Sequence, residues 1–162
     1  MMKKLLTTIS LALTLCLSLT TVFAAPSINK NGAVKKDSIL INGEKVDANT
    51  TAAFDSKKET YSAAGVSDET IDVIEKVNAN PSQLASLIKG VDLSGYSLLT
   101  EFQDLSVYVN GELKQKVKNV TLTWEVPNLV KTAKNVKVLH YSTERNTWEI
   151  LTPKSVDFDN KT

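Results

Sequence analysis

Histidine is the most versatile catalytic and metal-binding side chain, and the chain has one, His140. A Ser–His–Asp or Cys–His arrangement would have to be built on it. The only cysteine, Cys16, lies in a segment that we expect to be removed. One histidine without cysteines also lacks the donors of the usual zinc sites. His140 falls in a predicted strand beside Tyr141, and we interpret it as structural. We therefore assign no catalytic residue, no metal ligand and no cofactor.

Four carboxylates on predicted strands could serve a glycosidase, which needs two of them facing one cleft. They are Glu101, Asp104, Glu125 and Glu149. Glu125 and Glu149 each follow a tryptophan that we expect to be buried, so both should face solvent and pair with Lys or Arg across strands. A glycan-acting extracellular enzyme remains an alternative.

Aromatic side chains could form a platform for stacking sugars. Trp124 and Trp148 stand at strand spacing among Val and Leu, which favours the core. We expect Tyr108 and Tyr141 to be exposed and to be the ligand contacts.

Calcium binding is suggested only superficially, by Asp157 to Asn160. This run lacks the glycine and the distant glutamate of a calcium loop. Its composition predicts a hairpin turn instead.

The N-terminus has the layout of a secretory signal peptide over residues 1–24. Two lysines are followed by an uncharged run, and Ala24 ends it with a small residue before Pro26. We expect cleavage near Ala24, a secreted or cell-surface protein, and no transmembrane helix afterwards. Lipidation of Cys16, as in an envelope lipoprotein, is a further alternative. Leu15 stands before Cys16, however, where a small residue is required.

Cleavage of 24 from the 162 residues leaves 138, and it removes two lysines and no acid, so the net charge changes from +1 to −1. Such a mixed surface argues against nucleic acid as a partner. The mature chain has no cysteine and hence no disulfide.

The fold class that the pattern predicts is α+β. Residues 25–37 look like a flexible lead-in, and 38–162 like a single domain. Within it, 38–65 contains a hairpin at Asn42-Gly43 and an ambiguous loop. Residues 66–97 hold two short helices, at 67–78 and 81–89, because apolar residues recur at helical spacing.

From 98 to 162 apolar residues recur at every second position. This pattern predicts a sandwich-like antiparallel meander with the helices packed on it. A second hairpin turn is expected at Asn110-Gly111. Strands are expected over 120–126, 136–141, 148–151 and 155–158. The partner of the strand at 155–158 is missing, so we expect the last strand to be absent and 155–162 to be a sheet edge open to pairing.

Two stretches resemble small exported proteins of unassigned function from Gram-positive gut bacteria. They are DLSGYSLLTEFQDLSV and VTLTWEVPNLVKTAKNVKVLHYSTERNTWEILTPKSVDFDNKT, and the similarity covers roughly residues 65–162. The most specific piece is LHYSTERNTWEILTP, from Leu139 to Pro153. A looser likeness exists to β-modules of surface-anchored proteins. The resemblance implies an exported β-rich protein with a further C-terminal strand, and it brings no catalytic residues.

These observations favour a secreted or cell-surface binding protein without enzymatic activity. Its expected partner is a protein or a glycan outside the cell, bound through the sheet face or its loops.

Overall fold

The computed structural model describes residues 14–19, 31–114, 117 and 119–162. It is a mixed fold of mostly antiparallel strands with three short α-helices, which agrees with the α+β prediction. The strands are β1 (Thr14–Leu19), β2 (Ala33–Val34), β3 (Leu40–Ile41), β4 (Glu44–Lys45), β5 (Thr50–Asp55), β6 (Tyr96–Leu98), β7 (Asp104–Val109), β8 (Glu112–Lys114), β9 (Val120–Thr121), β10 (Trp124–Glu125), β11 (Lys134–Ser142) and β12 (Thr147–Leu151). The helices are α1 (Lys58–Ala63), α2 (Asp68–Ala79) and α3 (Leu84–Leu87), with a 3₁₀ turn at Pro81–Gln83 before α3.

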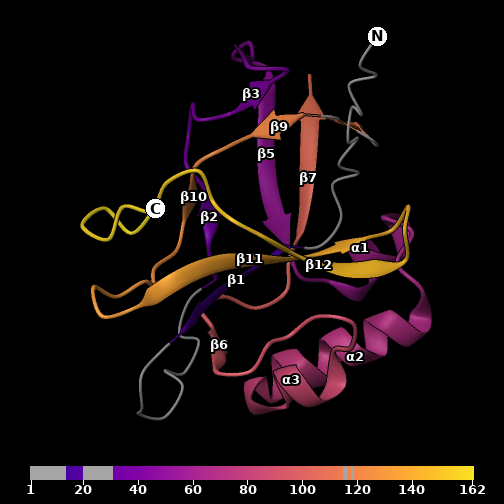
Figure 1. Ribbon diagram of the computed structural model, residues 1–162. Coiled ribbons are helices and arrows are strands. Elements are labelled where there is room, and N and C mark those ends of the chain that lie inside the picture. The colour runs from indigo at the N-terminus through magenta and orange to yellow at the C-terminus, as the bar shows by residue number, and fades with distance from the viewer. Residues whose placement is uncertain (1–13, 20–30, 115–116, 118) are drawn as a thin grey trace, which may run out of the picture.

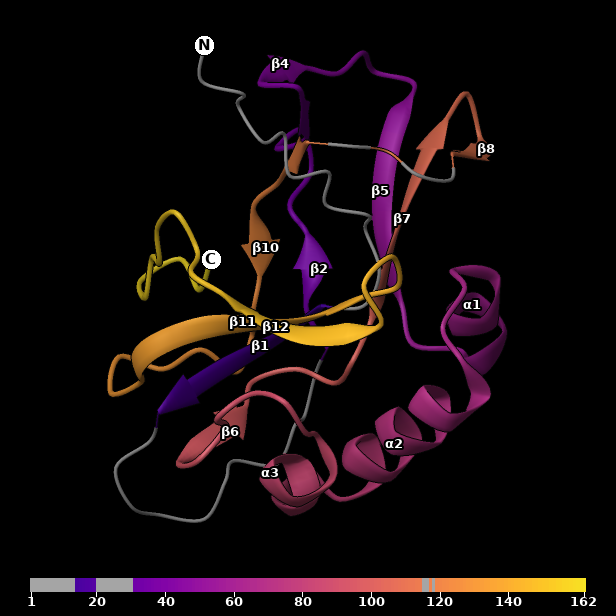
Figure 2. The ribbon, with the colours of Figure 1, turned by 45° about the vertical axis from the view of Figure 1, so that its right-hand side comes forward.

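The strands form several small sheets rather than one meander. A four-stranded sheet has the order β12-β11-β1-β6, two three-stranded sheets have the orders β4-β3-β9 and β5-β7-β8, and β10 pairs with β2. Both ribbon views show α2 and α3 beneath the four-stranded sheet, while β5 and β7 rise from its other side (Figures 1 and 2).

The two predicted helices are present close to their expected positions. The Ser67 hydroxyl accepts a hydrogen bond from the Thr70 amide at the start of α2. The buried face of α2 packs with residues of the four-stranded sheet in the larger core. That core contains Ile71, Ile74, Val77, Leu84, Ile88, Leu98, Phe102, Leu139 and Tyr141. Helix α1, where the sequence was ambiguous, adds the buried Tyr61.

Both Asn-Gly hairpins are confirmed. Asn42 (φ 55°) and Gly43 (φ 85°) connect β3 to β4, and Asn110 (φ 53°) and Gly111 (φ 78°) connect β7 to β8. Two successive positive φ angles match the twist of the flanking strands, which is why Asn-Gly marks these turns.

Two strand predictions were wrong. The strand expected over 120–126 is broken into β9, which pairs with β3, and β10, which pairs with β2. No strand forms over 155–158, because the Asp157 carboxylate accepts the amides of Asp159 and Asn160 and turns the chain. The predicted turn itself is present, closed by two hydrogen bonds between Asp157 and Thr162.

Part of the segment that we expected to be a flexible lead-in, over 25–37, is a paired strand. Ala33–Val34 pairs with Trp124–Glu125. Gly32 is buried there, and a Cβ at this position would lie 2.7 Å from the Glu125 carbonyl oxygen and closer still to the Trp124 indole nitrogen. Residues 25–30 lie outside the described residues.

Strand β1 consists of residues that we expected to belong to a signal peptide. It lies between β11 and β6, antiparallel to both. The remainder of 1–24 lies outside the described residues. Within the part of the chain that the structure describes, no helix is long and apolar enough to cross a membrane.

Candidate functional site

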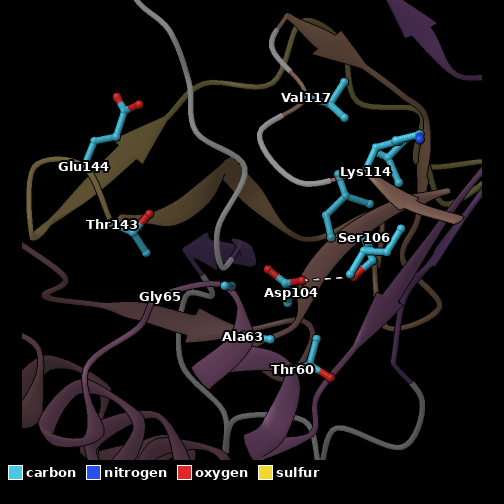
Figure 3. Close-up of a pocket in the computed structure, with 13 residues that line it drawn as sticks. Thr60, Ala63, Gly65, Asp104, Ser106, Lys114, Val117, Thr143 and Glu144 are labelled. Carbon is cyan, nitrogen blue, oxygen red and sulfur yellow. Dashed lines mark hydrogen bonds between the residues drawn. The ribbon is translucent and has the colours of Figure 1, made fainter. Parts of the chain in front are cut away.

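A pocket of about 420 Å³ opens where α1, β7, β8 and the turn between β11 and β12 meet (Figure 3). We call it the acidic pocket. Its polar lining residues are Thr60, Asp104, Ser106, Lys114, Thr143 and Glu144. The apolar lining includes Ala63, Leu105, Val107 and Leu113. Its volume lies within the range of roughly 300–1,000 Å³ that is usual for small-molecule sites.

Asp104 stands at the centre of the acidic pocket in Figure 3. Its residue is only 5% exposed, and the Ser106 hydroxyl donates a hydrogen bond of 3.1 Å to its carboxylate. Burying a carboxylate is costly unless charge or hydrogen-bond donors compensate it. The Ser106 hydroxyl is one such donor, and Asp104 is thus a nearly buried acidic side chain in the wall of the pocket.

Local hydrogen bonds place α1 against this carboxylate. Asp104 opens β7 and pairs with Asp55, the last residue of β5. The Asp55 carboxylate accepts the Lys57 amide at 3.1 Å and the Thr60 hydroxyl at 3.0 Å. These bonds turn the chain directly from β5 into α1 and bring Thr60 to the pocket.

Carboxylates near Tyr61 oppose the ionisation of its phenol. Burial raises the pKa of the Tyr61 phenol, and the charges of Glu101, Asp104 and Asp55 raise it further. The Tyr61 hydroxyl donates a hydrogen bond of 2.7 Å to the Phe102 carbonyl. Of these three carboxylates, Asp104 lines the pocket, and the charged side chains of Lys114 and Glu144 line it too.

The four carboxylates considered in the sequence do not share this pocket. Only Asp104 lines it. Glu101 accepts a hydrogen bond of 2.8 Å from the Asn31 amide, and Glu125 is exposed on β10. The second acidic side chain of the pocket is Glu144, whose carboxylate Figure 3 shows directed away from Asp104.

Glu149 belongs to a different cluster. The Arg145 guanidinium donates two hydrogen bonds to its carboxylate, at 2.7 and 2.8 Å. Glu149 thus pairs with a basic side chain as expected, but with one from the preceding turn and not from across the strands. His140 Nδ1 lies 3.6 Å from the same carboxylate, and His140 is buried in β11 with 1% exposure. The position of His140 in a strand agrees with the sequence interpretation.

The two tyrosines that we expected to be exposed differ in how deeply they are buried. Tyr108 is half-buried in β7. The exposure expected for Tyr141 was wrong, because Tyr141 is 4% exposed in the larger core and its hydroxyl donates a hydrogen bond of 2.9 Å to Asn146. Trp148 packs on Tyr141 and Phe102, with ring centroids 4.9 and 5.2 Å apart. A ligand contact at Tyr108 stays a prediction.

Trp124 is half-buried and stacks on Phe54 of β5, with ring centroids 4.6 Å apart. Both rings line a second pocket of about 630 Å³, whose other walls are mainly aliphatic side chains such as Val126, Leu129 and Val138. Trp124 thus joins the sheet of β10 and β2 to β5.

The run expected to be a turn rather than a calcium loop is a turn held by Asp157. The pKa of the Asp157 carboxyl is lowered, chiefly because the Asn160 backbone amide donates a hydrogen bond to the carboxylate. Among the described residues, no group of three or more His, Cys, Asp or Glu side chains could hold a metal ion.

Comparison with known protein families, with curated proteins and with solved structures found no match. The function is therefore argued from the geometry of the chain itself.

Proposed function

We propose that the chain is an exported, non-enzymatic binding protein. In this proposal residues 1–24 direct export, and the acidic pocket takes an amine-bearing sugar unit of an extracellular glycan. The observation that carries the proposal is the buried carboxylate of Asp104, in a pocket that hydroxyl-bearing side chains also line.

The pocket's chemistry supports this class of ligand. Carboxylates and the hydroxyls of Thr60, Ser106 and Thr143 can accept hydrogen bonds from ammonium and hydroxyl groups. A charge-assisted hydrogen bond to Asp104 would be roughly twice as strong as a neutral one.

We expect Asp104→Asn to weaken binding of a glucosamine oligomer by about tenfold or more, because a hydrogen bond to a charged group contributes about 1.5–3 kcal/mol. Titration calorimetry would measure this against the N-acetylated oligomer of equal length, which lacks the cation and should bind the unaltered protein weakly. Glu125→Gln, an exposed carboxylate outside the pocket, is the matched control. Equal binding of the two oligomers would refute the proposed ligand class.

The alternative is a carboxylate-dependent glycan hydrolase, because Asp104 and Glu144 line one pocket, and in it the Glu144 side chain would have to turn toward Asp104. A hydrolase would release reducing ends from the same oligomers or from cell-wall and mucin glycans. Loss of that release in both Asp104→Asn and Glu144→Gln, with folding retained, would establish the enzyme in place of the binding protein.

Export is tested separately. N-terminal sequencing of protein recovered from the culture medium is expected to begin near Ala25. Mass spectrometry would detect a lipid on Cys16 if the lipoprotein alternative holds. Protein that retains Met1 and stays in the cytoplasm would contradict export.

A further inference from the structure

Strand β1 lies in a position that only a strand can fill. It pairs with β11 through Thr14 to Leu19 and with β6 through Leu17 to Leu19. Adjacent strands are about 4.7–4.9 Å apart, so β6 and β11 stand roughly 9–10 Å from each other, too far for direct hydrogen bonds. Without β1, both would present unpaired backbone groups to a gap one strand wide.

The same residues form the uncharged core of the expected signal peptide. Export with cleavage near Ala24 would therefore remove a strand that is paired on both sides. We propose that the mature protein uses the gap between β6 and β11, which we call the strand slot, to bind an extended apolar segment of another extracellular polypeptide. This inference rests on the proposed export but not on the ligand of the acidic pocket.

The pairing of β1 defines the chemistry of the occupant. Its sequence alternates Leu15, Leu17 and Leu19 with small or polar residues and carries no charge. The residues paired with Leu15 on β11 and with Leu17 on β6 are Leu139 and Leu98, which are 0% and 1% exposed. An occupant should therefore carry apolar residues at the positions of Leu15 and Leu17 and run antiparallel to both neighbours, as in other cases of strand addition.

The mature chain has no obvious spare strand of this kind among its described residues. The most similar run is Val120 to Trp124, in which apolar residues alternate with threonine. Its two ends are already paired, with β3 and with β2. Supplying the slot of a second copy would require breaking those pairs, so we assign the occupant to a different polypeptide.

The experiment uses the full chain with a site-specific protease sequence inserted between Ala24 and Ala25. The folded protein is cut, the N-terminal fragment is removed in mild denaturant, and a labelled peptide of residues 12–21 is added. Amide hydrogen exchange in β6 and β11 is measured before the cut, after removal and after addition. The control peptide carries Leu17→Pro, which removes the backbone N–H at a position that pairs on both sides.

We expect removal of the fragment to speed amide exchange in β6 and β11, and the added peptide to slow it again by about tenfold or more, as for a re-formed sheet. The Leu17→Pro peptide should have no such effect. If the cut protein unfolds, the unaltered peptide should restore the fold and the control should not. The proposal is overturned if protection persists in a monomer without peptide, if the cut protein dimerises to regain it, or if the unaltered peptide restores neither protection nor fold. None of these readouts depends on glucosamine binding, and N-terminal sequencing tests export independently.

Discussion

Replacement of Trp124 with alanine is expected to lower the free energy of unfolding by about 3 kcal/mol, the lower end for Trp→Ala in cores, because the ring is half-buried. The loss combines the stacking on Phe54 with the packing of the indole against Gly32. The contact with Phe54 connects β10, and β2 paired with it, to β5, so the loss should be cooperative. Urea unfolding followed by circular dichroism would measure it.

Trp124→Phe is the matched control, because it keeps an aromatic ring beside Phe54 and should retain most of the stability. Combining Trp124→Ala with Phe54→Ala in a double-mutant cycle should give a coupling of about 0.5–1.5 kcal/mol for the aromatic pair. An unchanged unfolding free energy in Trp124→Ala would place the ring on the surface and would support a sugar-stacking role instead.

The second large effect is expected at alkaline pH and depends on Tyr61. Its pKa is raised in the folded protein, whereas in the unfolded chain it should be about 10. Above pH 10 or so the unfolded chain loses this proton while the folded protein keeps it. Stability should therefore be intact below about pH 10 and should fall by about 1.4 kcal/mol per pH unit above it.

Tyr61→Phe removes this dependence. At neutral pH the variant should be less stable by about 1 kcal/mol, because the hydrogen bond to the Phe102 carbonyl is lost. As pH rises, the stability of the variant should fall less steeply than that of the unaltered protein. The two curves of unfolding free energy against pH should therefore cross at roughly pH 11. Since lysine titration is common to both proteins, their difference isolates Tyr61. Parallel curves between pH 9 and 11.5 would contradict a raised pKa.

Local interactions made much of the fold predictable. The two Asn-Gly turns and the Ser67 cap depend on residues close in sequence, and both turns lie where they were expected. The short helix α1 was not predicted, because six residues with one buried side chain show no periodicity. The strands at Ala33–Val34 and Thr14–Leu19 depend on partners about 90 and 120 residues away, which no local pattern reveals.

The acidic pocket was only partly predictable. Asp104 was a candidate because carboxylates on strands can do chemistry, but alternation along β7 gave no indication that it is buried. Residues 102 to 104 and both Ser106 and Val107 are buried, since packing covers both faces at the start of this strand. Glu144 was missed because turn residues between predicted strands read as solvent-exposed.

The long sequence separation between β1 and β11 also determines how long β1 is without its partner strand during synthesis. Leu19 leaves the ribosome well before its partner strand, since 115 residues separate it from Lys134. At about 5–20 residues per second, this interval lasts roughly 6–23 s. Throughout it the N-terminal segment has no β11 to pair with. Under the proposed export, the segment would be available to the export machinery during this interval, and once β11 emerged, folding and export would compete for the same six residues. A cell that translates this chain faster than it captures the segment should then accumulate folded precursor.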